Sequence, residues 1–314
     1  MKTNTKTLSI KGEELKEAPF PVFQNKLGYD ESDKMNSAHF MLKLVWDNFG
    51  SPVTEVLKNG GKVLDICCGT GIWTLEMSVD FPKSRFYGID INHLFPECVK
   101  PPNSEFIQSN IQDGLPFEEE VFDFVFIRDT MLSLESKEWE NVVLNEAIRV
   151  TKPGGYIEIV EPHLVAYDFG ENFTNWFDTL LDMLLASKLD LSLNLNLDKI
   201  LDSHDRLDNN LEQVTIYYPI GKWGKVTGEF GKEATLCYIE YLKDRICDYT
   251  KMSKEDYERS CDQQAKLLYN DIIEPNKIKL KKVSEHGSSK IEWACIIHQI
   301  MEILLAETNL KGFP

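Results

Sequence analysis

The chain has 314 residues, 42% of them hydrophobic, and a formal net charge of −17. It is long enough to bury a proper core in one large domain or two modest ones. The negative charge, with no basic run to offset it, repels phosphate polymers and disfavours nucleic acid as a substrate. No apolar run approaches the roughly 18 residues of a membrane span, and residues 1–17 do not resemble a secretory signal. We therefore expect a soluble intracellular protein, cytoplasmic or nuclear, that binds neither nucleic acid nor a membrane.

Strand and helix patterns alternate along the first half of the chain. Residues 1–20 are polar and aperiodic and are expected to form a tail. The expected elements are then a helix at 37–57, a strand at 62–66, a helix at 71–79, strands at 85–91, 105–108 and 122–127, a helix at 139–150 and a strand at 156–161. In the 71–79 helix, Ile72, Leu75 and Val79 share one face. Such alternation predicts a parallel sheet covered on both faces, with a ligand site at the carboxyl ends of the strands.

The periodicity changes after Pro162. A broad apolar stripe at helical spacing runs from Phe173 through Trp176 to Leu185, and it predicts either a core face or a hydrophobic lid. An alternating strand is expected at 214–218, a helix at 236–246, and a final strand at 293–298 before a C-terminal helix.

The seven cysteines form an odd and scattered set. Cys67 and Cys68 are adjacent rather than spaced as Cys-x-x-Cys, and no second cluster with the spacing of metal ligands accompanies them. A metal site is therefore disfavoured. Low-pKa thiol chemistry at Cys67 stays open, because the segment precedes a helix N-terminus. The ordinary interpretation is that both cysteines are small packing residues.

The segment Val63–Trp73 turns from a buried strand into a helix through Gly-Thr-Gly. The glycines allow a tight turn and a close approach of a ligand to the backbone, and Asp65 adds a carboxylate at the same edge. A dinucleotide fold needs bare N–H groups here for pyrophosphate, whereas a carboxylate suits a cationic, hydroxyl-bearing ligand such as S-adenosylmethionine (SAM). Asp90 follows 25 positions later at the end of the second strand, where it suits ribose hydroxyls. A nicotinamide dehydrogenase is disfavoured, because the Gly-x-Gly-x-x-Gly spacing is absent.

These residues resemble the first motif of class I SAM-dependent methyltransferases, Asp/Glu-x-Gly-x-Gly-x-Gly. Cys67 stands where the first glycine is usual, as in quinone-biosynthesis C-methyltransferases with a Cys-Cys-Gly-Thr-Gly turn. Asn110 stands where that family has an aspartate against adenine, with Asp113 as the alternative, and Arg128 is expected to order its loop or contact SAM. The cofactor-binding residues that the resemblance implies are Asp65, Cys67, Gly69, Gly71, Asp90, Ile91, Asn110, Ile111 and Arg128.

The resemblance continues through FDFVFIRD and EAIRVTKPGGYIEIVEP and covers residues 55–163. Finer details, among them GTGIWTLEM and PIGKWGK, resemble the fungal LaeA-like methyltransferases, a group that includes regulators of secondary metabolism. The implied fold is Rossmann-like α/β: a seven-stranded, mostly parallel sheet of order 3-2-1-4-5-7-6 with its last strand antiparallel, helices on both faces and a helical cap. It implies one methyltransferase domain at 21–314, with a cofactor-binding core at 55–163, and with the cap and the rest of the sheet at 164–314.

The chemistry asks little of the protein, because a sulfonium methyl is already electrophilic. Positioning and exclusion of water suffice, with a base only where the acceptor must lose a proton. Asp129 and His163, after the fourth and fifth strands, are the catalytic candidates; Glu161, His39 and His93 could also approach, and a structural role competes for each. The expected function is methyl transfer to a small-molecule or protein side-chain (peptide) acceptor. The alternative is a SAM-binding LaeA-like regulator that acts through protein partners with little or no methyl transfer.

Overall fold

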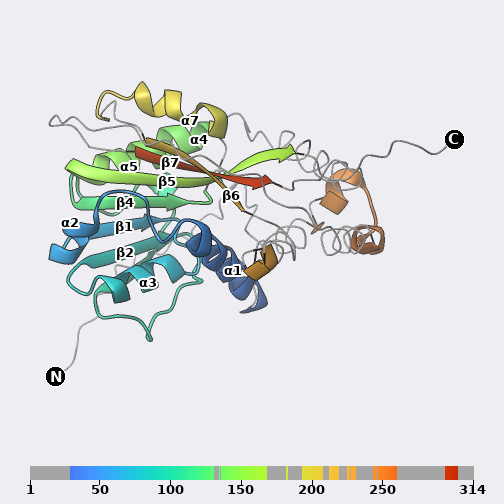
Figure 1. Cartoon of the computed structure of the whole chain (residues 1–314), viewed down its shortest axis with the longest axis horizontal. Coiled ribbons are helices and arrows are strands. Elements are labelled where there is room, and N and C mark those ends of the chain that lie inside the picture. The colour runs from blue at the N-terminus through green and yellow to red at the C-terminus, as the bar shows by residue number, and fades with distance from the viewer. Residues whose placement is uncertain are drawn as a thin grey trace.

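The structure is a computed structural model that describes residues 29–130, 134, 136–167, 182, 193–207, 212–218, 225–226, 228–230, 243–244, 246–259 and 294–302. Its strands form one sheet in the order β3-β2-β1-β4-β5-β7-β6 (Figure 1). This parallel α/β sheet with helices confirms the expected fold class. The strands are β1 Lys62–Ile66, β2 Arg85–Asp90, β3 Ser104–Gln108, β4 Phe122–Arg128, β5 Thr151–Tyr167, β6 Glu212–Tyr218 and β7 Ala294–Glu302.

The pairings of β7 with β5 and with β6 are parallel, so the expectation of an antiparallel last strand is wrong. Ile157 pairs with Ala294 and Glu161 with His298, which means that residue numbers rise together along β5 and β7. A parallel neighbour requires a crossover connection of at least about a dozen residues. Residues 219–293 separate β6 from β7 and easily supply that length.

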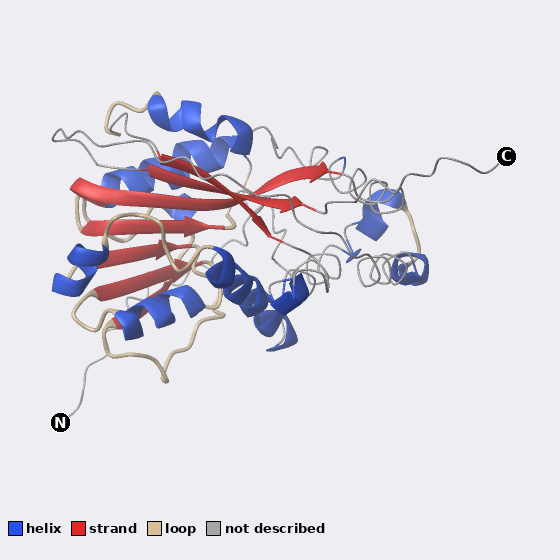
Figure 2. Cartoon of the chain, viewed as in Figure 1, coloured by secondary structure: helices blue, strands red, loops and turns tan. Residues whose placement is uncertain are grey.

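The helices cover both faces of the sheet (Figure 2). The single helix expected at 37–57 is two helices, because Gly50 and Pro52 lie in the connection between them. The helix expected at 139–150 starts earlier and contains a π-helical stretch at Trp139–Leu144. The helices are α1 Tyr29–Val45, α2 Thr54–Asn59, α3 Ile72–Asp80, α4 Ser136–Glu138, α5 Asn145–Val150 and α7 Leu193–Asp202, with a 3₁₀ turn at Ile111–Asp113.

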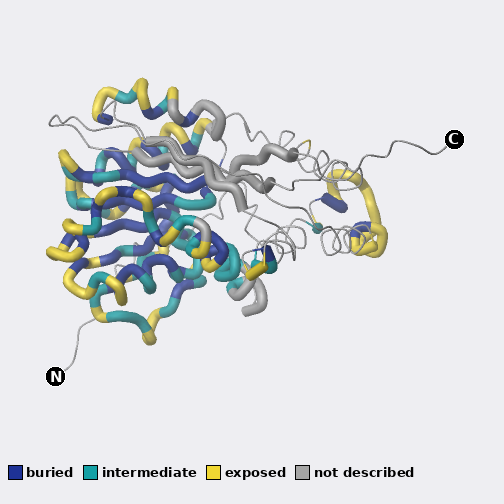
Figure 3. The backbone as a smooth tube through the Cα atoms, in the orientation of Figure 1, coloured by how far each residue is buried: buried dark blue, intermediate teal, exposed yellow. Residues whose placement is uncertain are grey.

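Alternate side chains of each central strand enter two separate apolar layers, as the period of a strand requires. In β1, Val63 packs with α2 and α3, whereas Leu64 packs with the π-helical stretch, α5 and α7. Figure 3 shows the result: the sheet centre is buried, the loops at the amino ends of the strands are mostly exposed, and the residues next to the carboxyl ends of β1, β3 and β4 are buried or intermediate. Packing on both faces of the sheet therefore fixes the positions of the strand ends.

The face that α3 buries differs from the expected one. Trp73 stacks on Phe126 with ring centroids 3.9 Å apart, and its Nε1–H donates to the backbone oxygen of Asn48 at 2.6 Å. Met77 is fully buried beside it, whereas Val79 is 66% exposed. A buried tryptophan contributes a large apolar area and satisfies its N–H, so it fixes the rotation of the helix more strongly than a valine does.

The Lys-Pro-Gly-Gly segment, expected as a turn before a strand at 156–161, lies inside a longer β5. The ladder between β4 and β5 is irregular between Phe122 and Phe124, which pair with Thr151 and Tyr156. More residues of β5 than of β4 lie between those two pairs, so β5 bulges there. Gly154 adopts φ 74° within the bulge.

Some expectations fall on other parts of the chain. The strand expected at 214–218 is confirmed as β6, and the one expected at 293–298 is confirmed as β7. Nearly all of the stripe at 173–185, most of the helix at 236–246 and the C-terminal helix lie outside the described residues. The division into a tail, a core and a cap stays a prediction. No helix in the described ranges combines the length and the apolar character that a membrane span needs.

Candidate functional site

The carboxyl ends of β1, β2 and β4 bring three carboxylates to one edge of the sheet. Asp65 is in β1, Asp90 ends β2, and Asp129 directly follows β4. In Figure 1 the strand arrows point toward this edge, and α1 lies beside it. The two acids predicted to bind the cofactor, Asp65 and Asp90, thus lie at the same edge as the catalytic candidate Asp129.

The loop between β1 and α3 has a left-handed backbone at three positions. Cys67 has φ 58°, Gly69 has φ 54° and Gly71 has φ 73°. Glycine adopts left-handed backbone conformations more readily than other residues, because it has no Cβ. Cys67 therefore occupies a position that suits glycine, as its place in the motif predicted.

The thiols of this loop are poor nucleophiles. Burial raises the pKa of the Cys67 and Cys68 thiols well above the usual range, and the charges of Asp65 and Asp90 raise them further. Both cysteines are free. In the described part of the chain, no three His, Cys, Asp or Glu side chains gather as a metal site would need.

Gly71 has no room for a side chain. A Cβ at this position would lie 2.5 Å from Cε1 of Phe106, and Gly88 on β2 lies against the same ring. The ring of Phe106 stacks in turn on Phe95, with centroids 5.1 Å apart. The close packing of loop and ring fixes where α3 starts.

We expect Gly71→Ala to destabilise the fold by at least about 2 kcal/mol, because it adds a clash to the cost of a left-handed alanine. Gly154→Ala is the matched control, since Gly154 has φ 74° and nothing within 4 Å of its would-be Cβ. Urea unfolding of both variants separates the two costs. Equal losses would show that the contact with Phe106 contributes nothing.

Asp65 is buried beneath the loop and accepts a hydrogen bond from Thr74 Oγ1 at 2.6 Å. Burial raises the pKa of Asp65 to about 7; the Thr74 hydrogen bond and the Arg128 charge oppose this rise, and the charge of Asp90 adds to it. Because the pKa of this carboxyl lies so close to neutral pH, a nearby cation would stabilise its ionised form. Thr74 is a site residue that the sequence did not single out, although its place one turn into α3 follows the motif.

Asp90 organises the glycine loop as well as the end of β2. Its Oδ2 accepts the Gly69 N–H at 2.9 Å, and its Oδ1 accepts the Asn92 N–H at 2.8 Å. Burial raises the pKa of Asp90, and these hydrogen bonds oppose the rise. The Gly69 hydrogen bond of Asp90 therefore ties the end of β2 to the glycine loop.

The loop after β3 lies next to Asp90, because Ser109 N–H donates to the Asp90 backbone oxygen at 2.9 Å. Asn110 is buried, and its Oδ1 accepts the Gln112 N–H at 3.1 Å. The side chain of Ile111 is buried in the core. Asp113, the alternative adenine residue, is exposed.

Ile91 follows Asp90 and is half-buried. Its backbone oxygen accepts a hydrogen bond from Gln108 Nε2 at 2.9 Å. Ile91 therefore lies next to Asp90, where the carboxyl ends of β2 and β3 meet.

Arg128 ends β4 and is linked to α1. Its guanidinium donates to His39 Nδ1 at 3.2 Å and lies 5.8 Å from the centroid of the Phe126 ring. Since Arg can only donate, His39 Nδ1 must accept, and His39 carries its proton on Nε2. Nε2 lies 2.9 Å from Glu76 Oε2, so it donates to that carboxylate. Glu76 was not predicted; the spacing of His39 and Lys43, which both reach it, was the available signal.

Asp129, a catalytic candidate, pairs with Arg128 through one carboxylate oxygen and, within the described part of the chain, leaves the other without a hydrogen bond. Its Oδ1 is buried with no hydrogen-bond partner among the described residues, and Oδ2 lies 3.8 Å from Arg128 Nε. Burial raises its pKa to about 6, against the opposing charge of Arg128. Its backbone is left-handed, with φ 56°. Strained backbone and a carboxyl with a raised pKa are features that gather at functional sites.

The other candidates differ. Glu161 is fully buried and accepts hydrogen bonds from the backbone N–H and the hydroxyl of Thr130, so it anchors the loop after β4. His93 is at the surface, 3.2 Å from Glu97. His163 lies on β5 opposite Ile300, with its side chain outside the described part.

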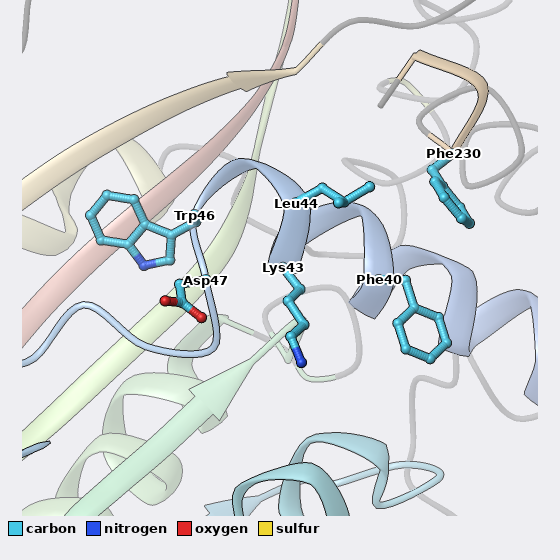
Figure 4. A pocket seen from close by; sticks show the side chains of 6 residues that line it. All are labelled: Phe40, Lys43, Leu44, Trp46, Asp47 and Phe230. Atoms are coloured by element: carbon cyan, nitrogen blue, oxygen red, sulfur yellow. The ribbon is translucent and has the colours of Figure 1, made fainter. Parts of the chain in front are cut away.

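A separate pocket of about 620 Å³ lies at the C-terminal end of α1 and the turn that follows it (Figure 4). That volume is typical of small-ligand pockets. None of the residues predicted to bind SAM lines it. The lining residues are Phe40, Lys43, Leu44, Trp46, Asp47 and Phe230.

Comparisons with known proteins agree with this arrangement. Residues 63–155 match the family described as "Methyltransferase domain". The "Demethylmenaquinone methyltransferase" of Lactococcus lactis is 36% identical over 110 residues, which cover 32% of this chain and 42% of that protein. The protein of the same name from Bacillus subtilis is 33% identical over 141 residues, covering 42% and 59%. The chain thus spans about two fifths to three fifths of the length of these relatives.

Solved structures also match. A putative methyltransferase from an antibiotic biosynthesis pathway of Anabaena variabilis is 12% identical, with a TM-score of 0.41, over 75% of this chain and 86% of that one. A SAM-dependent methyltransferase from Aquifex aeolicus is 20% identical, with a TM-score of 0.34, over 51% and 88%. The family match thus falls on residues 63–155, the segment that contains the glycine loop and Asp90.

Proposed function

We propose that this protein is a class I SAM-dependent methyltransferase that acts on a small-molecule or protein side-chain acceptor. The observation that carries the proposal is the contact between Gly69 N–H and Asp90, which joins a left-handed glycine loop to a buried acid at the next strand end. The family match over 63–155 spans both residues.

The residues at this edge fit SAM. The carboxylate of Asp90 at the end of β2 suits two ribose hydroxyls. The raised pKa of Asp65 means that its ionised form would gain from a bound cation. The glycine loop lets a ligand approach the backbone, and Asn110 lies beside Asp90 with an amide that can contact adenine. SAM, when bound, supplies a methyl group on a sulfonium that needs no further activation. The chain's task is therefore to orient the two reactants and exclude water.

Where the acceptor must lose a proton, we assign Asp129 as the base. Its pKa of about 6 leaves it ionised at neutral pH yet basic enough to take a proton. It directly follows β4, at the same edge of the sheet as Asp65 and Asp90. His163 remains a second candidate by its place on β5.

Incubation with methyl-labelled SAM and a cell extract, separated into protein, metabolite and nucleic-acid fractions, tests the function. We expect label in the metabolite or the protein fraction. Asp129→Asn should lower the transfer rate by about 10²-fold or more, which is typical for loss of a general base, while SAM affinity stays the same. Label confined to nucleic acid, or none at all with SAM bound, would contradict the proposal.

The names of the relatives and the net charge of the chain bear on which acceptor is methylated. The names of the bacterial relatives point to an aromatic quinone-type small molecule, which suits an uncharged acceptor for a chain of charge −17. The likeness to LaeA-like proteins, with a nuclear location and action through protein partners, remains a prediction from residue patterns alone. If the labelling experiment shows SAM binding without transfer, that regulatory function becomes the better proposal.

A further inference from the structure

Helix α1 covers the glycine loop as well as reaching β4 through His39. Asn36 Oδ1 accepts a hydrogen bond from Thr70 Oγ1 at 2.7 Å, and a Cβ at Gly69 would lie 3.1 Å from Met35 Cε. Met35, Asn36, His39 and Lys43 follow helical spacing, so one face of α1 makes all these contacts. The same helix therefore touches the loop, α3 and the end of β4.

His39 is the residue of α1 that reaches two of these elements. Its side chain is 1% exposed and lies between the Arg128 guanidinium and the Glu76 carboxylate. Burial, followed by the Arg128 charge, lowers the pKa of His39 to about 4, although the Glu76 hydrogen bond opposes the shift. His39 is therefore neutral at physiological pH. Because the tautomer of the neutral imidazole is fixed, Nδ1 is its only acceptor atom. It therefore sets the orientation of the Arg128 guanidinium, which a mobile water molecule would not do.

Building on the proposed function, we propose that His39 is a positioning residue, which holds Arg128 toward the cofactor edge and clamps α1 over the glycine loop. SAM binding and docking of α1 are then linked equilibria, because a bound ligand and the helix close the same loop. The contacts that carry the proposal are His39 with Arg128, His39 with Glu76, and Asn36 with Thr70.

Calorimetric SAM titration of His39→Leu and His39→Asn tests this role. We expect His39→Leu to weaken SAM binding about tenfold or more, the size of effect that loss of a hydrogen bond to a charged group produces. The amide oxygen of asparagine can take the place of Nδ1, so His39→Asn should recover part of that affinity. Lys43→Met is the matched control, because Lys43 also binds Glu76 at 2.9 Å without touching Arg128; it should weaken SAM binding clearly less than His39→Leu does.

Hydrogen exchange distinguishes positioning from mere stability. In the wild type, SAM should slow exchange across residues 35–43, and in His39→Leu this protection should be lost. Should His39→Leu fail to fold, Glu76→Ala removes the other anchor of His39 at a partly exposed position, and it should weaken SAM binding about threefold or more. Wild-type SAM affinity in these variants would overturn the inference. Absence of SAM binding by the wild type would instead overturn the proposed function.

Discussion

Asp65→Asn should make the ligand-free protein more stable at pH 8 while it weakens SAM binding. Burial raises the pKa of Asp65 to about 7 in the folded protein, whereas the ordinary pKa of an aspartate side chain is 3.8. A carboxyl whose folded pKa is raised binds its proton more tightly in the folded state. Its stability cost is therefore absent below about pH 4, grows as the pH rises, and is complete above about pH 7.

The shift of about three pKa units corresponds to a cost of about 4 kcal/mol at pH 8 and about 1.5 kcal/mol at pH 5. An amide carries no charge, and its oxygen can still accept the Thr74 hydroxyl, so Asp65→Asn removes much of this cost. Urea unfolding of wild type and variant at both pH values measures the difference. The gain should be about 2–3 kcal/mol larger at pH 8 than at pH 5.

The control for this prediction is Asp113→Asn, which changes an exposed carboxyl in the loop after β3. It should alter stability little at either pH. A gain for Asp65→Asn that does not depend on pH would contradict the assigned origin of the effect. A more stable variant with wild-type SAM affinity would remove Asp65 from the binding site. Stability sacrificed at a binding residue is common in enzymes.

Asp90→Ala should lose about 2–3 kcal/mol of SAM affinity, the usual contribution of charge-assisted hydrogen bonds to two hydroxyls. The same change also removes the acceptor of the Gly69 and Asn92 N–H groups, so it should loosen the loop in the free protein. Asp90→Asn keeps one acceptor oxygen and should fall between wild type and alanine. Calorimetric titration well below the melting temperature measures the affinities.

Glu158→Ala provides a matched control for loss of a buried carboxylate. Glu158 is fully buried and accepts the N–H groups of Gly50 and Ser51, as Asp90 accepts those of Gly69 and Asn92. The variant should be destabilised yet bind SAM like the wild type. If Asp90→Ala behaved in the same way, Asp90 would be structural only, and the ribose assignment would be wrong.

Local sequence patterns were sufficient for the strand ends but not for what covers them. Asp65 and Asp90 follow short apolar runs, and parallel strands bring their ends to one edge, so their proximity follows from the strand assignment. Cys67 could be placed from the motif alone, and its φ of 58° agrees. These features depend on neighbours within a few residues or on adjacent strands.

The features that were missed depend on distant partners. His39 and Glu76 are 37 positions apart, and no local period reports such a pair. The prediction of which face α3 buries was wrong. Periodicity identified an apolar stripe, whereas the stacking of Trp73 on Phe126 determines which face packs on the sheet. The direction of β7 was carried over from the family and could not be derived, since a long connection permits either direction.

The central claim is that this strand edge is a SAM site, and titration of the unmodified protein with SAM, its demethylated product and NAD tests it most directly. The account predicts that SAM and the demethylated product bind in competition, one per chain, and that NAD does not bind. Binding of NAD in place of SAM would contradict it, as would the absence of any heat of binding or thermal stabilisation with SAM.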